Sequence, residues 1–217
     1  MKPKESDSGS LKPIELPKPK FSRDRTLESS LKRRMTVRTI AERKLSLQQL
    51  SNLLWSASGI NRKKGPFDVP GITAGSASNS QEIDIYVALE EGVFRYEPLH
   101  HILQPVASGD LRGLAIGKGQ KAFGSIAPVR LIYVADIGKF STAGFQEPGL
   151  QDPETQKAYY YVDTGLIAEN VYLFAASQGL AAWFHNCDKK ELSKKLMLGP
   201  NQRPLFGQTI GYKKKGQ

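Results

Sequence analysis

The stretch from Thr73 to Leu89 limits the fold most strongly, because a loop of small polar residues runs directly into an alternating apolar segment. Apolar side chains recur there at every second position: Ile83, Ile85, Val87 and Leu89. This alternation predicts a half-buried strand. The preceding residues 75–81 read G-S-A-S-N-S-Q, and such small side chains let a backbone approach a flat or anionic ligand closely. From these residues alone, an ordinary polar connection is the alternative.

The charge of the chain is concentrated at its ends. The 217 residues carry a formal net charge of +10, yet residues 45–212 hold 15 basic and 15 acidic side chains. A nucleic-acid partner is therefore not expected, because it requires basic residues on the folded surface. No apolar run reaches the ~20 residues of a membrane span, so no membrane is expected either. Without a signal-like start we expect a cytoplasmic protein, or a periplasmic one if a signal was removed.

Residues 1–24 form a segment of different composition, rich in Lys and Pro. Proline at this density favours an extended arm. We expect it either to be disordered or to lie along a neighbouring subunit, with Ile14 and Leu16 as anchors. The domain division that follows is an arm at 1–24 and a single folded domain at 25–217.

A possible phosphate clamp follows the arm. In an extended segment Arg34, Thr36 and Arg38 project from one side, because side chains alternate. Two guanidinium groups flanking a hydroxyl suit a phosphate, to which Arg gives bidentate hydrogen bonds. A solvated basic stretch after a helix is the other interpretation.

The remaining pattern predicts an α+β protein with an antiparallel or mixed sheet under helices. We expect helices at 47–57, 111–115, 163–178 and after Asp188, and strands at 83–89, 93–96, 128–135, 180–184 and 204–212. Ser46 and Gln49 form a capping box for the first of these helices. Residues 137–157 are predicted to be a lid or a disordered loop. His100 and His101 are expected at the surface, with no metal site, because no ligand spacing accompanies them.

Several motifs in order resemble the FMN-dependent nitroreductase family. They are R-R-M-T-V-R, L-S-L-Q-Q-L-S-N-L-L-W-S-A-S-G-I-N-R, A-G-S-A-S-N-S-Q-E-I-D-I-Y-V, G-V-F-R-Y-E-P, G-K-G-Q-K-A-F-G-S-I-A-P, D-T-G-L-I-A-E-N-V-Y-L-F-A-A-S-Q-G-L and Q-T-I-G-Y. The likeness covers roughly residues 27 to 212 and leaves the arm outside. It implies a nitroreductase-like α+β fold, with a central, mostly antiparallel sheet flanked by helices, and an intertwined homodimer with FMN at the subunit interface.

The resemblance also implies a set of cofactor contacts. The segment that would bind the phosphate and ribityl chain contains Arg34, Thr36 and Arg38, and the basic residues Lys213 and Lys215 would lie near the phosphate. The loop that would reach the other subunit's flavin contains Ser76, Ala77 and Asn79. The residues that would lie near the flavin ring are Gln120, Asn186 and Cys187. Two departures stand out. Gly75 replaces the family's usual Pro, and Asn186-Cys187 replaces Glu-Gly.

The activity that the resemblance implies is centred on the flavin, with no catalytic side chain. NADH or NADPH would reduce FMN, which would then reduce a nitroaromatic, a quinone or a similar small molecule in a ping-pong cycle. The alternatives are a flavin-dependent oxidase or dehydrogenase of a peptide or small molecule, and a flavin-binding member without catalysis. Cys187 is expected to be a packed thiol rather than a reactive one.

Overall fold

The computed structural model describes residues 11–22, 25–123 and 127–214. Its helices are α1 (Leu27–Arg33), α2 (Leu47–Ser58), α3 (Pro153–Gln178) and α4 (Lys189–Lys195). Its strands are β1 (Ile14–Glu15), β2 (Ile60–Arg62), β3 (Gly71–Ile72), β4 (Ile83–Ala88), β5 (Gly92–Glu97), β6 (Ile102–Ser108), β7 (Val129–Asp136), β8 (Leu180–His185) and β9 (Gln202–Tyr212). Short 3-10 turns occur at Pro66–Asp68, Ala77–Asn79, Lys118–Phe123 and Ile137–Thr142.

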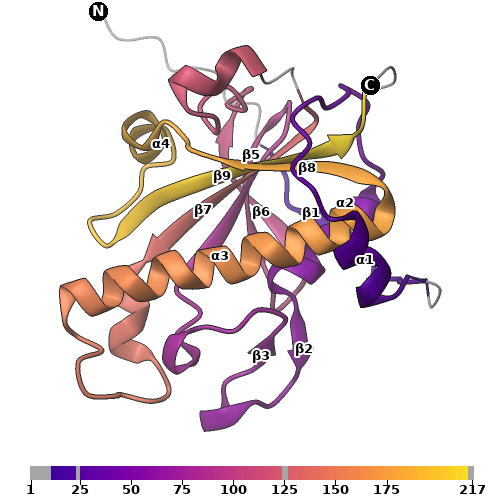
Figure 1. The fold of residues 1–217 in the computed structure, drawn as a ribbon. Coiled ribbons are helices and arrows are strands. Elements are labelled where there is room, and N and C mark those ends of the chain that lie inside the picture. Colours follow the sequence, from indigo (N-terminus) through magenta and orange to yellow (C-terminus); the bar gives the residue numbers. More distant parts are fainter. Residues whose placement is uncertain (1–10, 23–24, 124–126, 215–217) are drawn as a thin grey trace, which may run out of the picture.

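The strands form one large antiparallel sheet in the order β1-β6-β5-β4-β7-β9-β8, while β2 and β3 pair separately. The long helix α3 runs across the sheet, and α4 lies on the opposite side from α3 (Figure 1). The fold is therefore α+β with helices flanking the sheet, as the sequence predicts.

Alternate side chains of β4 face two hydrophobic cores on opposite sides of the sheet. Ile83, Ile85 and Val87 pack with α2 and α3 in the larger core, whereas Tyr86 and Ala88 face the smaller core under α4. Strand β7 is buried along nearly its whole length, because both of its faces are covered. The predicted strand at 83–89 is confirmed.

The helix caps follow the sequence signals. Ser46 and Gln49 form the predicted capping box of α2. Helix α3, however, begins at Pro153 and not at 163, because Asp152 caps it by accepting the N–H of Thr155 at 2.8 Å. The predicted lid or disordered loop at 137–157 is therefore wrong in its last residues. In its first part, Phe140 is fully buried.

One predicted helix is absent, and strands β1, β2, β3 and β6 were not predicted. Residues 111–115 form turns, since Asp110 accepts hydrogen bonds from both the main chain and the guanidinium of Arg112. These local bonds compete with helix formation. Strand β6 carries Pro105 within it, a residue that argues against a strand when only the sequence is read.

The described part of the arm packs on its own chain. Strand β1 pairs with β6, and Leu16 is buried in the main core. The Ser51 hydroxyl bonds to the Pro17 carbonyl and lies 2.8 Å from Nε2 of His101. His101 is thus half-buried in a structural contact, whereas His100 is exposed as expected.

Candidate functional site

The edge of the sheet at β8 is lined by the segment that carries the predicted clamp. The N–H of Val37 donates to the carbonyl of Ala182 in β8 at 2.9 Å, and Ile40 forms a bridge with Lys213. The segment therefore extends the sheet beyond its last strand. It places residues from the start of the chain beside the end of β9, where the N–H of Ala41 donates to the Tyr212 carbonyl at 2.8 Å.

The clamp residues meet two aromatic rings. Thr36 Oγ1 lies 3.1 Å from the hydroxyl of Tyr172, and the Arg34 guanidinium lies 5.6 Å from the centre of the same ring. The Arg38 guanidinium lies 5.7 Å from the centre of the Trp183 ring. Arg34 and Thr36 are thus brought together at α3, while Arg38 reaches β8.

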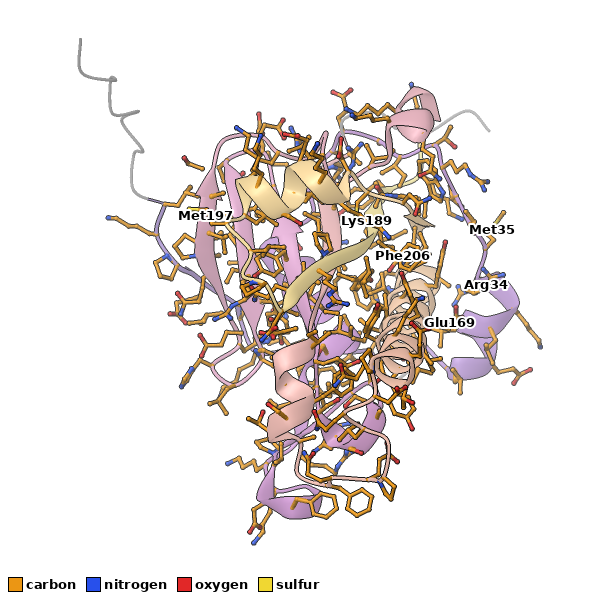
Figure 2. All side chains as sticks on the ribbon, turned by 90° about the vertical axis from the view of Figure 1, so that its left-hand side faces the viewer. Arg34, Met35, Glu169, Lys189, Met197 and Phe206 are labelled. Atoms are coloured by element: carbon orange, nitrogen blue, oxygen red, sulfur yellow. The ribbon has the colours of Figure 1, made fainter. Side chains whose placement is uncertain are left out.

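A cavity of about 250 Å³ opens beside Arg34. It is lined by Arg34, Met35, Tyr172 and Lys213, among others. Figure 2 shows Arg34 and Met35 on the same side of the molecule as Glu169 of α3. The cavity combines four cationic side chains, those of Lys32, Arg33, Arg34 and Lys213, with the ring of Tyr172. Lys215 lies outside the described residues.

The turn that contains Gln120 meets the residue that follows β8. The N–H of Asn186 donates to Oε1 of Gln120 at 3.1 Å, and the N–H of Gly117 donates to the carbonyl of Asn186 at 2.7 Å. A Cβ atom at Gly117 would lie only 3.1 Å from that same Gln120 oxygen. Gln120 and Asn186, expected at one site, do lie together.

The ionisable side chains next to Asn186 are held in their neutral forms. Burial raises the pKa of the Cys187 thiol to about 11. Burial also lowers the pKa of His185 to about 4, and its Nε2 lies 2.7 Å from Thr209 Oγ1. Near pH 7 neither of these two side chains carries charge.

The loop at 76–81 is held by internal bonds. The main-chain N–H of Gln81 donates to Ser76 Oγ at 3.0 Å, and the Gln81 amide donates to Asn79 Oδ1 at 3.0 Å. Ser78 and Asn79 have positive φ values of 52° and 51°, a region that disfavours residues other than Gly. Within the described residues, the buried Ser78 Oγ and Asn79 Nδ2 have no hydrogen-bond partner.

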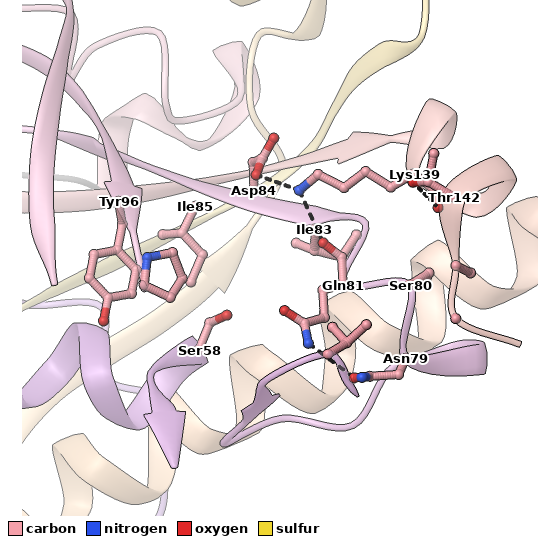
Figure 3. A pocket seen from close by; sticks show the side chains of 14 residues that line it. Ser58, Asn79, Ser80, Gln81, Ile83, Asp84, Ile85, Tyr96, Lys139 and Thr142 are labelled. Carbon is pink, nitrogen blue, oxygen red and sulfur yellow. Dashed lines mark hydrogen bonds and ion pairs between the residues drawn. The ribbon is translucent and has the colours of Figure 1, made fainter. Parts of the chain in front are cut away.

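A second cavity, of about 300 Å³, lies beside this loop (Figure 3). Lys139 enters it from the turn after β7, and its Nζ lies 2.8 Å from Asp84 Oδ1 and 3.1 Å from the Gln81 carbonyl. The sequence reading missed this ion pair. The available signal was Asp84, a charged residue set among the apolar residues of β4.

Within one chain, the residues expected to contact the cofactor form three separate groups. Two of these groups lie along β8, and the third lies in the 76–81 loop. The loop lies next to exposed apolar residues of α3, since a Cβ on Gly75 would be 3.8 Å from Leu166 Cδ1. Tyr161, Val162 and Leu166 are exposed by 38%, 59% and 46%. Helix α3 therefore buries one face in the core and leaves an apolar face exposed.

Comparison with known proteins identifies the family to which this fold belongs. The profile of the Nitroreductase family matches residues 31–212. The Methanocaldococcus jannaschii protein named "Putative nitroreductase MJ1384" is 31% identical over 161 residues, which cover 71% of this chain and 75% of that protein.

Solved structures agree. A crystal structure from Ralstonia eutropha JMP134, described as "a putative nitroreductase", has a TM-score of 0.83 at 31% identity and covers 98% of this chain and 93% of its own. A chain of the Escherichia coli microcin synthetase McbBCD complex shares the fold, with a TM-score of 0.67 at 18% identity, covering 82% of this chain and 68% of its own. The chain belongs to the nitroreductase family.

Two further observations concern membrane spans and metal sites. Within residues 11–22, 25–123 and 127–214, no helix is long and apolar enough to cross a membrane. Over the same ranges, no group of three or more His, Cys, Asp or Glu side chains is placed to hold a metal ion.

Proposed function

We propose that this member of the oxidoreductase family is an FMN-dependent enzyme that works as a homodimer. NADH or NADPH would serve as reductant and a small molecule, such as a nitroaromatic or a quinone, as acceptor. The observation that supports the proposal is that the residues expected to bind the cofactor lie in separate parts of one chain. Two groups follow β8, while the third lies in a loop beside the exposed apolar face of α3.

The residues along β8 fit a phosphate and a flat polar ring. Arg34 and Lys213 line one cavity, and two cations suit a phosphate group. At the other end of β8, Gln120 accepts from Asn186 through Oε1, which leaves its Nε2 as a donor toward a ligand. We assign Thr36 and Arg38 to the same cofactor, and Cys187 to the wall of the ring site.

The loop would complete the site of the partner subunit. The loop that holds Ser76, Ala77 and Asn79 follows Gly75, which lies next to Leu166, and contact between the α3 helices of two copies would bury this apolar face. The buried Ser78 Oγ and Asn79 Nδ2 have no partner among the described residues, as expected for a loop that binds a polar molecule. Cofactor binding and dimerisation would then depend on each other.

Bound FMN would supply the redox chemistry, taking a hydride from the nicotinamide and passing electrons to the acceptor. The protein would bind and orient the reactants and stabilise negative charge on the ring through amide donors. His185 and Cys187 are both neutral near pH 7, which agrees with a site in which the flavin and not a charged side chain supplies the chemistry.

An absorption spectrum of the purified protein tests the proposal. We expect flavin absorption that NADH or NADPH bleaches and that a nitroaromatic or quinone restores. A colourless protein that does not take up added FMN would overturn the proposal. Bound flavin that neither nucleotide reduces would favour the member without catalysis.

A further inference from the structure

A buried carboxyl group lies directly behind the 76–81 loop. Glu82, the residue before β4, has no exposed surface. Its Oε2 accepts a hydrogen bond from the hydroxyl of Ser80 at 2.7 Å, but its Oε1 receives none from the described residues. Burying a charged carboxylate oxygen without a hydrogen-bond donor costs free energy, so the protonated form of this carboxyl group is favoured.

A second carboxyl group reaches the same place from α3. Asp163 is 4% exposed, and its Oδ2 accepts the main-chain N–H of Ala77 at 2.8 Å. The charge of Asp163 acts on Glu82, and repulsion between two buried carboxylates favours keeping one proton on the pair. Burial, and then the charge of Asp163, raises the pKa of Glu82 to about 7; burial also raises the pKa of Asp163.

The other charged groups around the pair are engaged elsewhere. Lys139 bonds to Asp84 and to the Gln81 carbonyl. On β7, Asp136 donates its N–H to the Glu82 carbonyl, while its carboxylate accepts from Gly138. On α3, the Tyr159 hydroxyl bonds to Glu147. Asp163 is therefore the charged group that acts on Glu82.

The two carboxyl groups hold both ends of a strained turn. Ala77 and Ser80 flank Ser78 and Asn79, whose positive φ values persist only if surrounding contacts enforce them. Asp163 fixes the first end through a main-chain N–H, and Glu82 fixes the second through a hydroxyl. Loss of the proton would place two negative charges in buried contact and weaken both attachments.

We propose that Glu82 and Asp163 share one proton, and that this proton fastens the 76–81 loop in the conformation that meets the partner subunit's flavin. The two are positioning residues, since they act through the loop. This role rests on the proposed function, whereas the shared proton does not. It follows that cofactor affinity falls as the pH rises through about 7.

The test compares the full-length protein with Glu82→Gln at pH 6 to 9. Gln at this position keeps an acceptor for Ser80 and a donor for Asp163 but cannot titrate. We expect FMN to dissociate about tenfold more readily from the wild type at pH 8.5 than at pH 6, measured by the fluorescence of released flavin. Glu82→Gln should hold FMN equally at both values, and Glu82→Ala should hold it poorly throughout.

A readout without flavin separates the two parts of the proposal. The infrared carbonyl band of a protonated carboxyl group should be present in the wild type at pH 6, disappear with a midpoint near 7 and be absent from Glu82→Gln. If this band never appears, the shared proton is refuted. If the band titrates but FMN affinity does not change with pH, the loop role is refuted. If the band titrates and FMN never binds, the proposed function fails and the proton pair stands.

Discussion

The main-chain N–H of Asn186 donates a hydrogen bond to Oε1 of Gln120 at 3.1 Å, which joins positions 66 residues apart. This bond fixes the orientation of the Gln120 amide, because the oxygen must face β8 and Nε2 must then point away from it. The main-chain N–H of the residue that follows β8 is thus already used by a side chain of the same protein.

Gln120→Glu separates the two functions of this side chain. Glu retains the acceptor for Asn186 but loses the Nε2 donor and adds negative charge. We expect the Kd for FMN to rise about tenfold, with the thermal stability nearly unchanged, since one hydrogen bond contributes about 1 kcal/mol. Lys121→Gln, a change at an exposed residue of the same turn, serves as the control. Equal affinities of the wild type and Gln120→Glu would place the flavin edge elsewhere.

Arg34→Ala tests the phosphate cavity. Loss of one charge-assisted contact, worth about 1.5–3 kcal/mol, should weaken FMN binding roughly 10- to 100-fold. Riboflavin, which lacks the phosphate, should bind the variant and the wild type alike. Arg203→Ala, at an exposed position of β9, controls for the loss of a positive charge. A parallel loss for riboflavin and FMN would mean that Arg34 contacts the ring or stabilises the fold.

Much of the fold could be predicted because local chemistry and tertiary packing agree in the central elements. The alternation from Ile83 and the capping box at Ser46 each specify one structure, and both are found. The start of α3 was missed because residues 153–157 lack apolar side chains that would mark a helical period, and 158–162 form a continuous run without that period. There the signal was a cap, Asp152 followed by Pro153, rather than a hydrophobic pattern.

The candidate site was less predictable, because its residues meet through tertiary contacts. Arg34 and Thr36 both face Tyr172, which lies more than 130 positions further along the chain. Nothing in the spacing of R-R-M-T-V-R identifies that tyrosine. Likewise the Lys139–Asp84 pair requires the turn after β7 to fold over β4, and single-sequence patterns carry no information on such contacts. The assignment of these residues to a cofactor is a prediction that the experiments above address.

Tyr172→Phe should loosen the clamp segment. The Tyr172 hydroxyl accepts the N–H of Phe184 at 2.8 Å and pairs with Thr36, so its removal leaves a main-chain donor at the sheet edge unpaired. We expect the free energy of unfolding to fall by about 1–3 kcal/mol in urea titrations, with weaker FMN binding. Tyr161→Phe, which keeps an apolar ring at an exposed position of the same helix, should leave the free energy of unfolding unchanged. If Tyr172→Phe is neutral, water satisfies the Phe184 donor.

Leu166→Glu should disrupt the dimer. A carboxylate in the apolar face of α3 would have to lose its hydration in an interface, a cost that a dimer of ordinary stability does not tolerate. Light scattering after size exclusion should show a monomer that has lost its flavin. Met197→Glu is the matched control, because Met197 is 81% exposed and lies on the opposite side of the molecule (Figure 2). A Leu166→Glu protein that stays dimeric would rule out this face as the interface.

The pH dependence of stability should reflect two buried groups with opposite effects. Burial raises the pKa of Glu82 to about 7 and lowers that of His185 to about 4. Folded Glu82 keeps a proton that the unfolded chain has lost above about 4.5, so its contribution to stability decreases as the pH rises from there through 7. Folded His185 stays neutral at pH values below about 6.5, where the histidine of the unfolded chain becomes protonated. Its contribution to the free energy of unfolding therefore decreases as the pH falls toward 4.

Between pH 4.5 and 6.5 these two contributions oppose each other, at about 1.4 kcal/mol per pH unit each. Glu82→Gln removes the first and leaves the second. Relative to the wild type, this variant should therefore lose about 3 kcal/mol of unfolding free energy when the pH falls from 6.5 to 4.5. Urea denaturation at several pH values measures the difference. Parallel stability curves for the two proteins across this window would show that Glu82 titrates like an exposed residue, and would also remove the basis for a proton shared with Asp163.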